Sequence, residues 1–153
     1  MKKRKKHPAL KIYLISRWLY LHNLEIIAKV FYYLNIIIFQ ASIAYEADIH
    51  ESVIFPHPRG VMIHPHTTIG ENTIIYQRVT LGDRSLDGEV QIHIGKNCFI
   101  GANSFVLGVI NIGDNVKIGC NTVVLENVKP NCTVVGVPGK VVKKSNKKAS
   151  RKK

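Results

Sequence analysis

Three histidines fall within the stretch FPHPRGVMIHPHTTIG, residues 55–70, and they are the first candidates for chemistry in this sequence. His57 stands between two prolines, while His64 and His66 are separated by one residue. Histidine acts as a general base near neutral pH. Two histidines on one flat face point the same way and can share a zinc ion. The residues alone leave His57 open as a base, a polar turn residue or a metal ligand.

The apolar residues around these histidines recur at every sixth position. A helix has a period of 3.6 residues and a strand a period of two, so neither explains this spacing. A coil of flat six-residue faces does, because one side chain of each face then points to the axis. The sequence predicts a mainly β fold, a parallel β-helix of hexapeptide repeats over residues 42–142. The positions form three series: Ile43, Ile49 and Phe55; Ile63, Ile69, Ile75 and Leu81; Ile94, Ile100, Val106, Ile112, Ile118 and Val124.

Two interruptions of the period mark where the coil is expected to release extra residues. The step from Phe55 to Ile63 is eight residues, so two extra residues fall around His57. The step from Leu81 to Ile94 is thirteen residues, which predicts an ejected loop. Function on repeat scaffolds concentrates at such insertions. We therefore expect His57 on a bulge at a corner of the coil.

Residues 12–41 form a second region, which is predicted to be helical. Two apolar runs separated by a His-Asn pair indicate two helices and a turn. In the second run Glu25, Lys29 and Tyr32 share one stripe, and nearly every other residue is apolar. Such a helix must be covered by its own domain, another subunit or a membrane surface, and we expect packing in the core or against a subunit.

The positive charge of the chain is concentrated at its two ends. Of the 22 Lys and Arg residues, six lie in residues 1–11 and eight in 140–153, and the span between has a net charge of −2. We expect basic tails over 1–11 and 143–153, which solvate the chain or contact an anionic membrane surface. Nucleic-acid binding is not expected, because no surface of mixed aromatic and basic residues accompanies the tails.

The three cysteines have no CxxC spacing, which argues against a disulfide framework or a zinc ribbon and favours a cytoplasmic location. Charged residues interrupt the apolar region 12–41. Neither a signal peptide nor a transmembrane helix is therefore expected.

These features resemble the hexapeptide-repeat acyltransferases, and within them the serine acetyltransferases and their short polysaccharide-modifying relatives. The resemblance runs from about Ser42 to Val142. It is carried by the motifs HPRGVMI, IGENTIIYQRVTLG, IGKNCFIGANSFVLG, IGDNVKIGCNTVVLENV and VVGVPGKVV. It implies a left-handed β-helix, a homotrimer, and acetyl-CoA bound in a groove between subunits, with no metal.

The resemblance also implies roles for residues of this chain. His57 matches the family's catalytic histidine, which takes the proton of an acceptor hydroxyl as its oxygen attacks the thioester carbonyl. A backbone N–H near Gly82 is the expected donor to the developing oxyanion. Ala102 and Cys120 match small residues beside the pantetheine arm of the cosubstrate. Lys140 matches a basic position near its nucleotide phosphates, although it also begins a basic run.

Three departures from the serine acetyltransferase pattern bear on the acceptor. In the family, a carboxylate fifteen residues before the catalytic histidine orients its ring. Ser42 stands at that position here, and Asp48 lies six residues after it. Gln91 takes the place of a histidine that grips the substrate carboxylate, and Arg84 lies earlier in the loop. The helical N-terminal domain is reduced to about forty residues. Asp48 and Arg84 are therefore only weak candidates for substrate binding.

The departures favour acetylation of a sugar hydroxyl, on a polysaccharide or its precursor, over that of L-serine in cysteine biosynthesis. Two further alternatives remain. One is a catalytically inactive β-helix that acts as a scaffold or binding protein. The other is metal-dependent hydration chemistry with zinc on His64 and His66, but we expect those two histidines to be surface residues.

Overall fold

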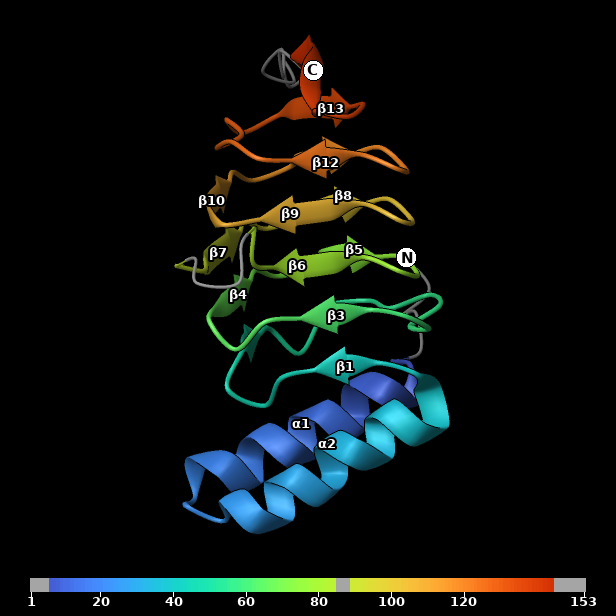
Figure 1. Cartoon of the computed structure of the whole chain (residues 1–153), viewed down its shortest axis with the longest axis vertical. Coiled ribbons are helices and arrows are strands. Elements are labelled where there is room, and N and C mark those ends of the chain that lie inside the picture. The colour runs from blue at the N-terminus through green and yellow to red at the C-terminus, as the bar shows by residue number, and fades with distance from the viewer. Residues whose placement is uncertain (1–5, 85–88, 145–153) are drawn as a thin grey trace, which may run out of the picture.

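The computed structural model describes residues 6–84 and 89–144 and shows a three-sided β-helix standing on two helices (Figure 1). The helices are α1 (Pro8–Leu21) and α2 (Glu25–Phe39), and the coils of the β-helix rise from them toward the C-terminal end of the described chain. No helix among the described residues is long and apolar enough to cross a bilayer.

Three sheets form the sides of the β-helix, and their coil strands pair in parallel. Face 1 contains β1 (Ser42–Ile43), β3 (Met62–Ile63), β6 (Thr80–Gly82), β9 (Phe105–Leu107) and β12 (Val123–Val124). Face 2 contains β2 (Asp48–Ile49), β4 (Thr67–Ile69), β7 (Gln91–Ile94) and β10 (Val109–Ile112). Face 3 contains β5 (Ile74–Ile75), β8 (Phe99–Ile100), β11 (Lys117–Ile118) and β13 (Cys132–Val135), and is extended by the antiparallel β14 (Lys140–Lys144).

The predicted six-residue period is confirmed by the core. All thirteen periodic apolar residues are buried, and none is more than 4% exposed. They stack directly over one another from coil to coil, as Ile63 over Ile43 and Leu81 over Ile63 on face 1. Burying an aliphatic side chain of this size contributes about 1.5–3 kcal/mol, so these ladders are the main source of stability in the coils.

Both predicted interruptions lie at corners. The one at residues 56–61 joins face 3 to face 1; we call this edge, with 76–79, 101–104 and 119–122 above it, the His57 corner. The second joins face 1 to face 2 between Gly82 and Gln91, and residues 85–88 of that loop lie outside the described residues. We call the edge between faces 1 and 2, which contains residues 64–66, the His64 corner.

The helical region begins earlier than predicted. Helix α1 starts at Pro8, four residues before residue 12, where the sequence placed the start of the helical region. Proline suits the first turn of a helix because its missing N–H would have no partner there. The ring of His7 caps the helix by accepting a hydrogen bond at Nδ1 from the Ala9 N–H (3.2 Å). At the other end β14 runs to Lys144, two residues past the predicted end of the β-helix, and residues 145–153 lie outside the described residues.

Helix α1 closes the lower end of the core. Leu10 and Tyr13 are fully buried and join the same apolar cluster as the coil residues. The Tyr13 hydroxyl donates a hydrogen bond to the carbonyl oxygen of Ala47 (2.6 Å) and accepts one from the Ile49 N–H (3.2 Å). Tyr13 therefore satisfies two backbone groups of the first coil that would otherwise be buried without partners.

Burial raises the pKa of Tyr13 to about 12, and this predicts a loss of stability in alkali. Because the folded pKa lies above the unfolded value of about 10, the contribution is complete below pH 10 and is lost as the pH rises toward 12. A shift of this size corresponds to about 3 kcal/mol. We expect Tyr13→Phe to flatten the fall in unfolding free energy between pH 10 and 12, measured by urea denaturation. An unchanged slope in Tyr13→Phe would contradict this assignment.

Candidate functional site

His57 lies exposed on the corner that carries its name. Gly60, three residues later, has a φ of +72°, and a Cβ there would lie 2.9 Å from Cγ of Arg78, so only glycine fits. The Gly60 N–H donates to the carbonyl of Gln40 (2.7 Å), the residue that caps the C-terminal end of α2. Buried Pro58 adds a fixed φ beside His57. The backbone that presents His57 is thus held between the first coil and the helices.

Two rings stand close to His57. Its ring centroid is 6.4 Å from that of Tyr76, which lies on the same corner one coil higher, and Tyr76 in turn packs on Phe99 (5.3 Å). Burial lowers the pKa of His7, and the nearby His57 lowers it further. No group within residues 6–84 and 89–144 donates a hydrogen bond to the His57 ring or accepts one from it. Both ring nitrogens are therefore available to a substrate.

The structure brings two predicted cosubstrate residues onto this same corner. The Asn103 N–H donates to the carbonyl of Gln77 (3.0 Å), and the Asn121 N–H to that of Ala102 (2.9 Å). Gln77, Ala102 and Cys120 therefore occupy equivalent positions in successive coils. His57, Ala102 and Cys120 line one edge of the β-helix, with His57 lowest and the exposed Cys120 highest.

Arg84 and Lys140 come together elsewhere. Both are exposed, and both line a pocket of about 520 Å³ with Glu126 and the turn at Pro138. Lys140 is the first residue of β14. The sequence assigned these two cations to different ligands, acceptor and cosubstrate respectively, but their shared pocket suits a single anionic group.

Gly82 ends β6 at the far edge of face 1 from His57. It is buried and lines a pocket of about 530 Å³ between face 1 and α2. Ser42, at the floor of this pocket, shares a hydrogen bond with the hydroxyl of Tyr32 (2.8 Å). Within one chain, the candidate base and the candidate oxyanion donor thus stand on opposite edges of face 1.

Asp48 lies on face 2, which is the side of the β-helix opposite the His57 corner. Its carboxylate forms an ion pair with Arg17 of α1 (2.9 Å). The Arg17 guanidinium also donates to the carbonyl of Glu46 (2.9 Å), so it ties the first corner to the helix. The core separates Asp48 from His57, so the carboxylate does not orient that histidine within the same chain.

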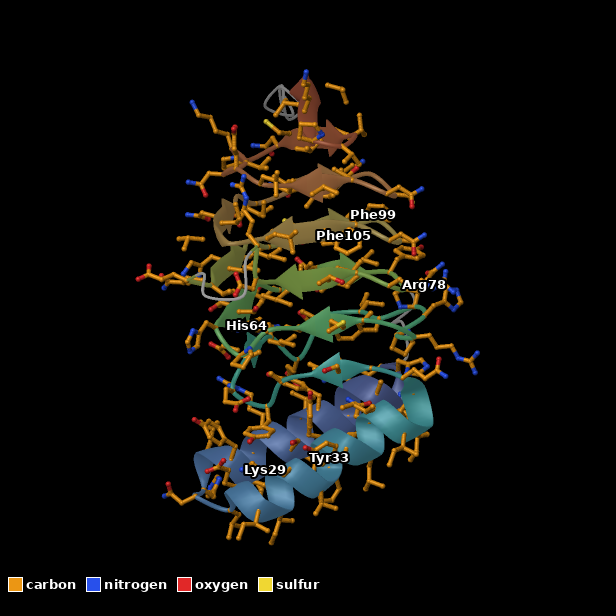
Figure 2. All side chains as sticks on the ribbon, in the orientation of Figure 1. Lys29, Tyr33, His64, Arg78, Phe99 and Phe105 are labelled. Carbon is orange, nitrogen blue, oxygen red and sulfur yellow. The ribbon has the colours of Figure 1, made fainter. Side chains whose placement is uncertain are left out.

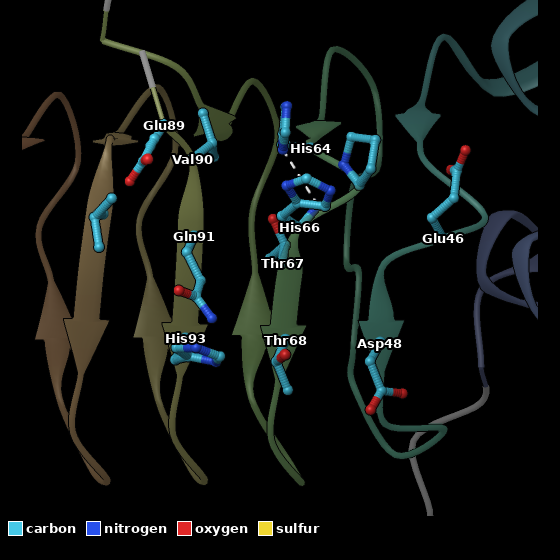
Figure 3. A pocket seen from close by; sticks show the side chains of 12 residues that line it. Glu46, Asp48, His64, His66, Thr67, Thr68, Glu89, Val90, Gln91 and His93 are labelled. Atoms are coloured by element: carbon cyan, nitrogen blue, oxygen red, sulfur yellow. Dashed lines mark hydrogen bonds between the residues drawn. The ribbon is translucent and has the colours of Figure 1, made fainter.

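His64 and His66 lie on a corner, so the flat face that the zinc alternative required is not present. Their ring centroids are 5.3 Å apart at an interplanar angle of 79°, and Nδ1 of His64 accepts a hydrogen bond from the His66 N–H (Figure 3). Burial, and then His66, lower the pKa of His64. Both line a pocket of about 690 Å³ together with Gln91 and His93. Among the described residues no three or more histidine, cysteine or acidic side chains are placed to hold a metal ion.

Sequence reasoning missed Tyr76, His7 and Arg17. Tyr76 could have been found, because an uninterrupted coil takes eighteen residues, as from Met62 to Thr80, and this places Tyr76 above Pro58. No comparable rule links the helices to the coils. The positions of His7 and Arg17 follow only from how α1 packs under the first coil.

Known proteins match this chain both in sequence and in architecture. Residues 91–126 match the family described as the hexapeptide repeat of succinyl-transferase. The chain is 36% identical over 138 residues to a serine acetyltransferase of Synechococcus elongatus, covering 90% of this chain and 57% of that protein. The solved Neisseria gonorrhoeae serine acetyltransferase in complex with serine matches with a TM-score of 0.83 and 33% identity, over 88% of this chain and 55% of that one.

A second solved structure, the serine acetyltransferase of Brucella abortus in complex with coenzyme A, gives a TM-score of 0.85 at 27% identity, over 90% of this chain and 56% of that one. The chain thus spans just over half the length of the relatives that it matches. The predicted left-handed β-helix is confirmed by these structural matches. On this evidence the chain belongs to the hexapeptide-repeat acyltransferase superfamily, in the branch that resembles the serine acetyltransferases.

Proposed function

We propose that this chain transfers the acetyl group of acetyl-CoA to a hydroxyl, with His57 as the general base. The observation that carries the proposal is the placement of His57, Ala102 and Cys120 along one edge of the β-helix. His57 is exposed, and within residues 6–84 and 89–144 neither ring nitrogen has a hydrogen-bond partner, as a base that must meet a substrate requires. The likeness to serine acetyltransferases solved with serine and with coenzyme A supports the same reaction.

In the proposed reaction His57 takes the proton from the acceptor hydroxyl as its oxygen bonds to the thioester carbonyl carbon. The carbonyl oxygen becomes an oxyanion, which the backbone N–H near Gly82 stabilises by hydrogen bonding. When the carbon–sulfur bond breaks, the imidazolium of His57 returns the proton to the leaving thiolate. No acyl-enzyme forms, so Cys120 needs no role beyond its small size beside the pantetheine arm.

A homotrimer would bring His57 of one subunit and Gly82 of another together at one site. His57 and Gly82 stand on opposite edges of face 1, so one chain cannot place both beside the same carbonyl. Outward-facing apolar side chains favour packing between subunits: Met62 and Phe105 on face 1 are 54% and 39% exposed. We propose that the His57 corner of one subunit meets the His64 corner of the next.

The pocket shared by Arg84 and Lys140 is proposed to hold the phosphates of the cosubstrate. Two cations at its rim lower the free energy of a bound phosphate, whereas Glu126 on the same rim limits how much negative charge the pocket accepts. This proposal moves Arg84 from the acceptor site, where the sequence placed it, to the acetyl-CoA site.

L-Serine is the acceptor to test first, because the similar proteins are serine acetyltransferases. Nothing in the comparisons supports the sugar acceptor that the sequence favoured. A sugar hydroxyl is kept as a second candidate on one observation. The position expected to grip the serine carboxylate is Gln91, which is exposed and uncharged, and next to it stands buried Val90.

Thiol release from acetyl-CoA tests the proposal, with L-serine, free sugars and nucleotide sugars as separate acceptors. Release that depends on L-serine supports the serine reading, and release only with a sugar supports the second candidate. If acetyl-CoA fails to bind in calorimetry and no acceptor releases thiol, the enzyme proposal is overturned. The inactive scaffold then takes its place. A cytoplasmic location remains a prediction from the cysteine pattern.

A further inference from the structure

An aromatic side chain, Tyr76, stands directly above the candidate base on the His57 corner. Its ring centroid lies 6.4 Å from that of His57. Phe99 of the next coil packs against the same ring, with the centroids 5.3 Å apart at an angle of 50°. Figure 2 shows Phe99 above Arg78, which lies on this corner. Both rings are half-buried, so the contact holds the Tyr76 ring in place and leaves part of it exposed beside His57.

This ring has no counterpart in the coils that carry the candidate cosubstrate residues. The parallel register of face 3 places Gly101, and then Gly119, above Tyr76 in the next two coils. Of these three stacked positions, only the lowest has a side chain. A large group therefore stands at the level nearest to His57, and none stands at this register on the two levels above it.

The acyl group of the cosubstrate has to lie at the level of Tyr76. A base lies about 3 Å from the hydroxyl oxygen that it deprotonates, and that oxygen lies about 3 Å from the carbon that it attacks. The carbonyl carbon is therefore within about 6 Å of a ring nitrogen of His57. Since the pantetheine arm is proposed to lie along Ala102 and Cys120, higher on the same corner, the acyl group enters the space above His57 that the Tyr76 ring bounds.

We propose that the ring of Tyr76 limits the acyl group to the two carbons of acetyl, a role that presupposes the acetyl transfer proposed above. The scaffold alone does not set the acyl group, because the chain matches a repeat family described from succinyl-transferase, whereas its similar relatives are serine acetyltransferases. An acetyl group presents one methyl to the ring. Each further methylene has to displace a ring that Phe99 backs, and packed aromatic side chains do not yield without cost.

The next two residues of the same coil are less suited to set this limit. Arg78 is exposed, and an exposed flexible side chain changes rotamer within nanoseconds, so it turns aside for a ligand. Gln77 stands under Ala102, at the register of the pantetheine arm. The ring contact with His57 belongs to Tyr76, which is therefore the residue expected to determine the acyl length.

Calorimetric titration of the full chain with acetyl-CoA and with butyryl-CoA tests the proposal and needs no acceptor. We expect the parent to bind butyryl-CoA at least about tenfold more weakly, and Tyr76→Ala to bring the two dissociation constants within about threefold of each other. Tyr76→Phe keeps the ring and should keep the ratio of the parent. Tyr20→Ala should also keep it, because this half-buried tyrosine of α1 contacts Tyr45 (5.2 Å) and lies away from the corner.

Two kinds of failure are distinguishable. If the parent does not bind acetyl-CoA, the proposed function is overturned and the role of Tyr76 with it. If the parent binds acetyl-CoA, the role of Tyr76 alone is overturned by any of three results: equal binding of both acyl-CoAs to the parent, an unchanged ratio in Tyr76→Ala, or an equal change of ratio in Tyr76→Phe or Tyr20→Ala.

Tyr76→Leu extends the test if Tyr76→Ala no longer binds acetyl-CoA. Leucine keeps an apolar side chain at the corner but removes the ring, so we expect it to bind acetyl-CoA and to bring the two dissociation constants closer than in the parent. Loss of acetyl-CoA binding in both variants would overturn the proposal, because the ring would then hold the cosubstrate as a whole and not select the acyl length.

Discussion

Replacement of His57 by alanine is expected to lower the turnover of acetyl transfer by about two to four orders of magnitude, the usual contribution of a positioned base. The acceptor hydroxyl must lose its proton as it attacks, and His57 is the exposed histidine on this corner, the side-chain type that takes a proton most readily near neutral pH. Steady-state thiol release at saturating acetyl-CoA gives the turnover, and calorimetric titration with coenzyme A shows whether the cosubstrate site is intact.

The fold should survive this change. His57 is exposed and makes no hydrogen bond within the described chain, so its truncation leaves no buried group without a partner. His22→Ala is the matched control, because His22 is also exposed but lies at the end of α1, in the turn between the two helices. We expect His22→Ala to retain turnover within about threefold, the size of effect typical of a surface position. A turnover in His57→Ala equal to that of His22→Ala would remove His57 from the mechanism.

The coils were predictable because one physical rule governs them. A side chain that points to the axis must be apolar, and the chain returns to the axis every six residues, so Ile94 through Val124 specify their own register. A departure from six is equally informative, and the eight-residue step correctly placed His57 at a corner. Periodicity therefore gave both the scaffold and the position of the candidate base.

The rest of the site depends on contacts that no period describes. Asp48 was only a weak candidate for substrate binding, and it lies on face 2 and pairs with Arg17, whose position depends on helix packing. The zinc alternative needed His64 and His66 on a flat face, but the chain turns between β3 and β4 and sets them on a corner. Such side chains are exposed, and burial does not dictate their neighbours.

The separation of His57 from Gly82 has a similar origin. The sequence shows that His57 and Gly82 both lie at interruptions of the six-residue period. It does not show at which corner of the coil each interruption falls, because that depends on the number of faces between them. Face 1 lies between them, so within one chain the candidate base and the candidate oxyanion donor stay apart. Their meeting across two subunits is therefore part of the proposal and could not be read from the sequence.

Gly101→Ala is expected to lower the free energy of unfolding by about 3 kcal/mol or more, at the upper end of what overpacking costs. A Cβ at Gly101 would lie 2.6 Å from the Cys120 backbone nitrogen and 2.7 Å from the Gly119 carbonyl carbon. These atoms belong to the backbone of the next coil, which is fixed by the core ladder and cannot move aside as a flexible side chain can. The coils would have to separate at the His57 corner, and buried ladder contacts would be lost.

Gly82→Ala provides the matched control, since the nearest atom to its added Cβ is Cγ2 of Thr80 at 3.7 Å, an ordinary van der Waals contact. We expect Gly82→Ala to change the free energy of unfolding by less than about 1 kcal/mol, because the smaller backbone entropy of the unfolded chain offsets any crowding. Urea denaturation followed by circular dichroism measures both variants. If both variants lose the same free energy of unfolding, the prediction is wrong, because the coils then make room for the added Cβ at no extra cost. The close stacking of Gly101 under Cys120 would then have no part in holding Ala102 and Cys120 on the same edge as His57.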